Sequence, residues 1–160
     1  MADFIEIDTS EVTTFLKVNL GDTLPKAFDT RKVVSDIADF VSGYMKARTL
    51  KGLDRDLEPF VDYAPSTKKQ RAKKGRQTGH VDLFDKGHMQ AAIGTRVDSD
   101  TEATVGLFSA IEGKKAIVHQ LGLGPMPQRE FFGIGKDDAI AQEAIQKIPE
   151  DELDRAIKQI

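Results

Sequence analysis

Helical spacing of apolar residues begins close to the start of the chain. The stretch Asp8–Glu11 offers side chains suited to a helix N-cap, and Val12, Phe15 and Leu16 follow at intervals of three and four until Gly21. This pattern predicts a short first helix.

A second and longer helix is predicted to begin near Thr23, with Pro25 in its first turn, and to run to Arg48. Its apolar residues recur every three or four positions: Val33, Val34, Ile37, Phe40, Val41, Tyr44 and Met45. A stripe this wide is typical of a helix that packs against more than one surface. We therefore expect this helix to be the spine of the core.

Periodicity is absent from about residue 49 to residue 82, where Gly, Pro, Asp, Ser and Lys dominate. A loop of this length inside one domain is uncommon and is usually functional or ordered by a partner. Its first half is too apolar for a free linker, so we expect Leu57, Phe60 and Tyr63 to be buried against the domain or against a neighbouring subunit. Residues 68–76 are then expected to form a mobile basic tip.

The second half of the chain mixes strands and helices. Ile93–Val97 and Ala103–Phe108 alternate apolar and polar residues around a turn, which predicts a β-hairpin. A helix over residues 110–121 ends at Gly122, and after an extended piece two more helices are expected over 136–147 and 149–160. The expected fold is α+β: one domain over residues 1–160, with a small antiparallel sheet packed against a long N-terminal helix and further helices, and a long extended loop at about 49–82.

Composition narrows the function classes. The 160 residues are 39% hydrophobic and 31% charged, as in globular domains, and include no cysteine, which excludes disulfides, cysteine-ligated metal centres and a cysteine nucleophile. No apolar run is long enough to cross a membrane, and the acidic start Met1-Ala2-Asp3 is unlike a signal peptide. We therefore expect a protein made and kept in a cytosol-like compartment, without membrane contact.

Charge is unevenly distributed although the formal net charge is only -3. Six basic residues fall within nine positions that hold no acid: Lys68, Lys69, Arg71, Lys73, Lys74 and Arg76. These residues are candidates for sequence-independent contacts with DNA phosphates, or for contacts with an acidic protein surface such as the acid-rich segment after Asp137. No aromatic residue interleaves with them, so base stacking is not expected.

Catalytic chemistry finds little support in the sequence. His80, His88 and His119 lie in three different segments without metal-ligand spacing, and no nucleophile stands beside a base. Two pairs of carboxylates occur, Asp82 with Asp85 and Asp137 with Asp138, but the second pair stands at the start of a predicted helix, where acids complement the helix dipole. We therefore expect no enzymatic activity, no metal and no cofactor.

Several short strings occur in the order found in virion morphogenesis proteins of tailed phages. They are Gly52-Leu53-Asp54, Pro59-Phe60-Val61-Asp62-Tyr63-Ala64, the basic run, Val81-Asp82-Leu83-Phe84, Lys86-Gly87-His88-Met89, His119-Gln120-Leu121-Gly122 and Pro127-Gln128-Arg129-Glu130-Phe131-Phe132-Gly133. The chain thus resembles tail-completion or neck proteins from Gly52 to its C-terminus, and the last two strings are the most specific. It departs from the family at Glu58-Pro59, where glycine and lysine often precede the proline.

This resemblance implies a non-catalytic structural protein of the virion, assembled in the host cytoplasm. It would form a ring that joins the head connector or stopper to the tail terminator or tail tube and lines the DNA channel; six or twelve copies remain open, and we expect six. Arg129, Phe131 and Phe132 would then lie in subunit or partner interfaces, together with Leu57, Phe60 and Tyr63, although one of the two phenylalanines is equally suited to core packing. The alternatives are a tail terminator that caps the tail tube, and an accessory protein that binds DNA through its basic loop.

Overall fold

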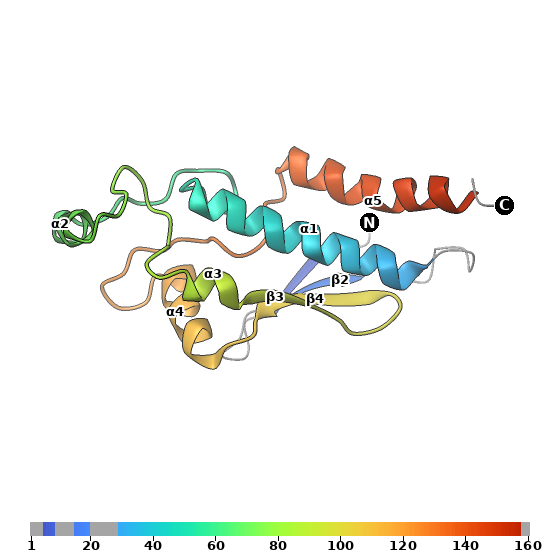
Figure 1. Cartoon of the computed structure of the whole chain (residues 1–160), viewed down its shortest axis with the longest axis horizontal. Coiled ribbons are helices and arrows are strands. Elements are labelled where there is room, and N and C mark those ends of the chain that lie inside the picture. The colour runs from blue at the N-terminus through green and yellow to red at the C-terminus, as the bar shows by residue number, and fades with distance from the viewer. Residues whose placement is uncertain (1–4, 9–14, 20–28, 158–160) are drawn as a thin grey trace.

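The computed structural model describes residues 5–8, 15–19 and 29–157. It has an α+β fold, as predicted, with two long helices side by side over a small sheet and shorter elements at one end (Figure 1). In chain order the elements are β1 (Ile5–Asp8), β2 (Phe15–Asn19), α1 (Thr30–Leu50), α2 (Pro65–Lys73), α3 (His88–Ala92), β3 (Ile93–Val97), β4 (Glu102–Leu107), α4 (Ala110–Leu121) and α5 (Ala139–Ile157).

The sheet is antiparallel, with strand order β1-β2-β4-β3. The predicted hairpin is confirmed: β3 pairs with β4, with Ile93 opposite Leu107 and Val97 opposite Ala103. β4 is a central strand against which α1 packs. Its residues are buried at consecutive positions from Ala103 to Leu107, so both of its faces are covered. The hairpin is therefore the part of the sheet on which the core is built.

The predicted first helix is wrong at Phe15–Asn19, which forms β2 between β1 and β4. Phe15 lies opposite Gly106 and Asn19 opposite Glu102, so every residue of the strand has a partner in β4. Pairing on both sides outweighs a short apolar periodicity that fits a helix and a strand almost equally well. The segment 9–14 of the predicted helix lies outside the described residues.

Helix α1 is the core spine that the apolar stripe predicts, although it begins at Thr30 rather than near Thr23. Asp29 has non-helical dihedral angles, and its side chain accepts a hydrogen bond from the Lys32 amide at 3.1 Å, which makes it the N-cap. Residues 20–28 lie outside the described part of the chain. The buried face carries Val33, Val34, Ile37, Ala38, Val41 and Met45, which pack against β3, β4 and α5.

Helix α5 corrects the two helices expected at the C-terminus. It runs from Ala139 to Ile157 without a break at Pro149, along the outer side of α1 (Figure 1). The sequence analysis treated this proline as a helix start, because proline is favoured in a first turn. Packing against α1 stabilises the helix on both sides of the proline and outweighs the lost hydrogen bond.

The loop predicted over residues 49–82 is not extended throughout. The first four basic residues of its basic run, from Lys68 to Lys73, lie on α2, a helix that begins at Pro65 and ends at Lys73, whereas Lys74 and Arg76 follow it. Helix α1 itself extends to Leu50. Helix α2 was not predictable from apolar spacing, because it is polar all round and buries only Arg71. It forms one tip of the molecule (Figure 1).

The connection from α4 to α5 returns through the core. Gly122 ends α4 in a left-handed conformation (φ +63°), and a Cβ there would lie 2.8 Å from the Gln128 amide, so the turn requires glycine. Phe131 and Phe132 follow and are almost fully buried, with ring centroids 6.2 Å apart in an edge-to-face arrangement. This corrects the prediction that both side chains lie in an interface, because both belong to the core of a single chain.

Candidate functional site

Residues 51–87 form an arm that projects beyond α1, and its base is tied to the rest of the chain. The Phe60 amide donates to the Gly52 carbonyl at 2.9 Å, and Leu53 forms a β-bridge with Pro59. The Arg55 amide donates to the Glu130 carbonyl at 2.7 Å. Phe60 is buried in the core, which confirms the expected contact with the domain.

Arg129 holds the arm from the other side. Its Nε and Nη2 donate to the Val61 carbonyl at 3.1 and 3.0 Å, and its guanidinium lies 5.7 Å from the centre of the Tyr63 ring. Its own amide donates to the His119 carbonyl at 2.7 Å, which ties the arm to the end of α4. Arg129 is therefore a buried residue that connects the arm to the body of the same chain. This corrects its expected role in a subunit interface.

The two C-terminal motifs are also joined to each other and to α1. Gln120 Oε1 accepts from the Phe132 amide at 3.0 Å, and Arg48 Nη2 donates to the carbonyls of Phe131 and Gly133 at 2.8 and 2.9 Å. Sequence analysis missed Arg48, although a charged residue three positions after Met45 on the apolar stripe was a usable signal. Burial lowers the pKa of Arg48, and the charge of Asp138 is the largest effect that opposes this shift.

Asp82 is the centre of a polar cluster inside the arm. Arg71 Nη2 donates to both of its carboxylate oxygens, at 3.0 and 2.9 Å, and the Tyr63 hydroxyl and Gln77 Nε2 donate to them at 2.9 and 2.7 Å. Burial by itself would raise the pKa of Asp82, but hydrogen bonds from Gln77, the Phe84 amide and Tyr63, together with the charge of Arg71, lower it below its ordinary value. The cluster therefore holds an ionised aspartate at neutral pH.

This pKa gives the arm a predicted acid sensitivity. Because the folded-state pKa of Asp82 lies below the unfolded value of about 3.9, its contribution to stability is complete above that value. The contribution is lost as the pH falls through the lower folded pKa. We expect the amides around Tyr63 to keep their hydrogen-exchange protection from pH 7 to about 5 and to lose it below about 4, earlier than the core strands.

Asp82→Asn is the control for this prediction, since it cannot titrate. The variant is expected to have a weaker arm at neutral pH and no steep change below about pH 4. Equal acid sensitivity of the arm in the variant and the unmodified chain would assign the transition to another group.

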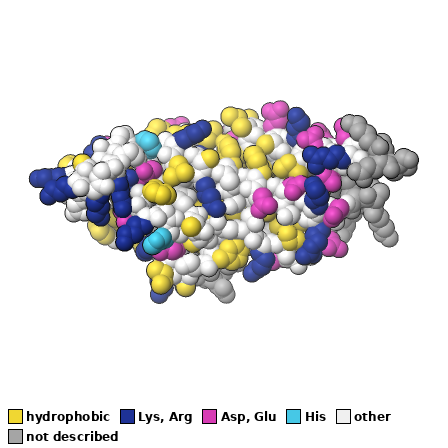
Figure 2. Space-filling view, viewed as in Figure 1, with side chains coloured by type: hydrophobic (Ala, Val, Ile, Leu, Met, Phe, Trp, Pro, Cys, Tyr) yellow, Lys and Arg dark blue, Asp and Glu magenta, His cyan; other side chains and the backbone are white. Residues whose placement is uncertain are grey.

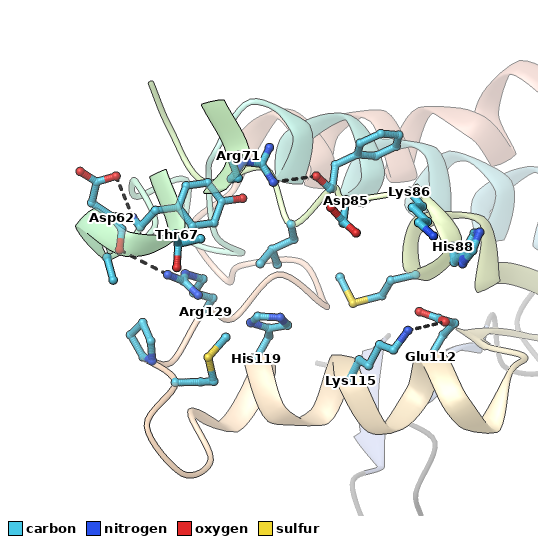
Figure 3. Close-up of a pocket in the computed structure, with 18 of the residues that line it drawn as sticks. Asp62, Thr67, Arg71, Asp85, Lys86, His88, Glu112, Lys115, His119 and Arg129 are labelled. Carbon is cyan, nitrogen blue, oxygen red and sulfur yellow. Dashed lines mark hydrogen bonds and ion pairs between the residues drawn. The ribbon is translucent and has the colours of Figure 1, made fainter. Parts of the chain in front are cut away.

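A groove of about 700 Å³ lies between the arm and α4. Figure 3 shows Arg71, Asp85, Lys86 and His88 on the side of the arm and α3, Lys115 and His119 facing them from α4, and Arg129 at one end. Apolar side chains also line the groove: Leu83, Phe84, Met89, Pro125, Met126 and Pro127. The groove thus combines an apolar lining with basic side chains.

The carboxylates of the groove are already neutralised. Asp62 pairs with Lys68, Asp85 with Arg76, and Glu112 with Lys115 at 2.7 Å. By contrast, Arg129 donates only to backbone carbonyls within the part of the chain that the structure describes. The groove therefore favours an anionic group over a cationic one.

His119 lines the groove in its neutral form. Burial, and then the charge of Arg129, lower its pKa, and its Nδ1 is buried without a hydrogen-bond partner among the described residues.

The basic run divides into three parts. Arg71 is buried on Asp82, so its expected contact with DNA or an acidic partner is corrected. Arg76 is partly exposed and pairs with Asp85. Lys68 is half-buried beside Asp62, and its hydrogen bond to that carboxylate lowers the pKa of Asp62. Lys69, Lys73 and Lys74 are exposed. They lie at the tip of the molecule where blue side chains gather in Figure 2.

Of the other two residues predicted to make contacts, Tyr63 is half-buried and Leu57 is exposed. Tyr63 is half-buried between the guanidinium groups of Arg71 and Arg129, and burial followed by its hydrogen bond to Asp82 raises its pKa. Leu57 is 36% exposed and adopts a left-handed conformation (φ +67°) in the turn at the base of the arm. Burial of Leu57 against the domain, one of the two expected alternatives, is therefore wrong.

The candidate catalytic residues do not converge. Asp82 is committed to Arg71, His80 Nε2 contacts the Leu50 carbonyl at 2.8 Å on the surface, and only Asp85, His88 and His119 line the groove. Over residues 5–8, 15–19 and 29–157, no cluster of three histidine or carboxylate side chains is arranged to hold a metal ion.

Lys86 and Lys115 are groove residues that sequence analysis missed. The predicted helix over residues 110–121 carried a signal, because Glu112, Lys115 and His119 are spaced three and four apart and share one face. Lys86 had no comparable signal, since the fold alone brings it opposite α4.

In the described part of the chain, no helix is both long enough and apolar enough to span a membrane. Comparison of the chain with protein families, with curated proteins and with solved structures finds no match in any of the three.

Proposed function

We propose that this protein is a structural subunit of a tailed-phage virion, a tail-completion or neck protein that forms a ring between the head connector and the tail. It acts by binding, without catalysis, and contacts the packaged DNA only without regard to sequence. Its expected location is the neck or tail end of the virion, assembled in the host cytoplasm. A tail terminator that caps the tail tube is the nearest alternative.

One observation carries the proposal: the motifs that resemble this phage family, far apart in sequence, meet at one joint. Arg129 binds the Val61 carbonyl and its amide binds the carbonyl of His119, while Gln120 binds the Phe132 backbone. Motifs that converge on a structural joint, and not on a set of reactive groups, are consistent with a protein whose task is to hold an arm in position.

The shape and charge of the chain add support. A ring of identical subunits needs two different complementary surfaces on each copy. The arm extends the chain at one end, and its tip is rich in lysine, whereas carboxylates interspersed with Lys and Arg gather toward the other end (Figure 2). Such a chain can present different surfaces to its two neighbours.

Deletion of the gene tests the proposal. If the protein completes the junction, host cells producing the phage should accumulate DNA-filled heads and separate tails, and complementation with the unmodified gene should restore joined particles. Electron microscopy of lysates counts both, and peptide mass spectrometry of purified virions detects the chain. Normal yields of joined virions that lack the protein would contradict the proposal.

A DNA-binding accessory protein is the second candidate, because α2 exposes Lys69, Lys73 and Lys74 at the tip of the arm. This function predicts binding of the purified chain to duplex DNA of any sequence, weakening steeply as salt rises. Replacing these three lysines with glutamine should abolish binding. DNA binding by the purified chain, combined with its absence from virions, would favour this candidate over the ring subunit.

A further inference from the structure

The second half of α5 has an outward face that differs from the face that contacts the body. Glu152 points back toward the chain, where it pairs with Lys32 at 2.9 Å and with Arg155 at 3.0 Å. Glu150, Leu153 and Asp154 are spaced three and four apart, so they share another face of the helix, and all three are exposed. Leu153 is 38% exposed between two carboxylates.

This acidic face matches the groove between the arm and α4. The groove offers apolar contacts from Met89 and Met126, with Lys86 beside them and with Lys115, which also pairs with Glu112 at 2.7 Å. An aliphatic side chain flanked by carboxylates is complementary to this lining, because the aliphatic group can pack against the methionines and the carboxylates can pair with the lysines.

The two surfaces of one chain cannot meet each other. Figure 1 places the C-terminal part of α5 at one end of the long axis of the molecule and α2, with the arm, at the other. An α5 segment in the groove must therefore come from a second copy. A contact between two different surfaces of identical chains is head-to-tail, and it closes into a ring when the rotation between copies permits.

We propose that the groove binds the acidic outward face of α5, Glu150, Leu153 and Asp154, from a second copy of this chain. The carboxylates lie beside Lys86 and Lys115, and Leu153 packs among the apolar residues of the groove. This inference rests on the proposed ring function and names the contact that builds the ring.

Cross-linking between two variants tests the contact without background, because the chain has no cysteine. A Lys115→Cys variant is mixed with an Asp154→Cys variant and treated with a short bis-maleimide. We expect a covalent heterodimer, and a ladder of multimers from the double variant. Lys114→Cys is the matched control, since Lys114 is exposed on the same helix but does not line the groove, and it should give little product.

Charge reversal gives a second, independent readout. Lys86→Glu with Lys115→Glu on one copy, or Glu150→Lys with Asp154→Lys on the other, should each cause loss of association in sedimentation velocity. A mixture of the two reversed variants should recover it, and the recovery should weaken as salt rises.

Equal cross-linking from Lys114→Cys and Lys115→Cys, no heterodimer at all, or no recovery in the reversed mixture would each overturn the proposed contact. These results are separable from those that bear on the proposed function. A chain found in virions but lacking this cross-link keeps its neck function and loses only the groove contact. A chain that cross-links as expected but is absent from virions keeps the contact and loses the neck function.

Discussion

Replacing Phe131 with alanine is expected to lower the free energy of unfolding by about 3–5 kcal/mol. Phe131 has no exposed surface and packs edge-on against Phe132 beneath α1, so truncation leaves a cavity that the surrounding core cannot fill. A loss of this size is a large share of the total stability of about 5–15 kcal/mol that domains have. Equilibrium unfolding in urea, followed by circular dichroism, measures it.

Ile111→Ala is the control, because it truncates a large apolar side chain that is exposed and not buried. Ile111 is 70% exposed on the outer face of α4, so its removal should change the free energy of unfolding by less than about 0.5 kcal/mol. If Phe131→Ala unfolds at the same urea concentration as the unmodified chain and only assembly is lost, Phe131 belongs to an interface after all.

The sequence predicted those helices and strands in which apolar residues recur at one regular spacing. The stripe of α1 repeats every three or four residues because a single side of the helix faces the sheet and α5. In the β-hairpin the apolar residues Ala103, Val105 and Leu107 alternate with Thr104 and Gly106 in the sequence, which was enough to predict a strand although all five residues are buried. Helix α4 was equally clear, since Gly122 marks its end. In each case the local pattern and the tertiary contacts require the same structure.

Elements stabilised by distant contacts were not predictable. Strand β2 exists because β1 and β4 pair with it on both sides, and the local sequence offers a helix cap just before it. Helix α2 shows no apolar period, because its one buried residue is an arginine. Pro149 lies inside α5 because packing on α1 supports both halves of the helix.

The residues of the candidate site also fall into those that the sequence made visible and those that only the fold reveals. The importance of the segment around Arg129 was visible in its motif, but its role was not, because the residues it binds lie 67 and 68 positions away in sequence. The basic run was visible as a cluster of charge, yet nothing local distinguishes Arg71 from its lysine neighbours. Only Asp82, brought back by the fold, removes Arg71 from the surface.

Arg71→Ala is expected to weaken the arm by about 3–5 kcal/mol, because it leaves the buried Asp82 carboxylate without its charged partner. The loss should be local, since the arm is joined to the body mainly at its base and at Arg129. Faster cleavage of α2 by trypsin and reduced hydrogen-exchange protection around Tyr63 measure it, with unchanged protection in β4. Lys69→Ala is the matched control on the same helix, because its side chain is exposed, and it should leave the protection around Tyr63 unchanged.

A double-mutant cycle decides whether the pair, and not the arginine alone, is responsible. Removal of Asp82 also removes the carboxylate that needs compensation, so Arg71→Ala with Asp82→Ala should cost less than the sum of the two single changes. Additive losses would mean that Arg71 acts through its bonds to the carbonyls of Gln77 and Phe84, at 2.9 and 2.8 Å. Arg71 belongs to the basic run that is a candidate for phosphate contacts. The cycle therefore also distinguishes Arg71, which stabilises the arm, from the exposed lysines, which remain available for such contacts.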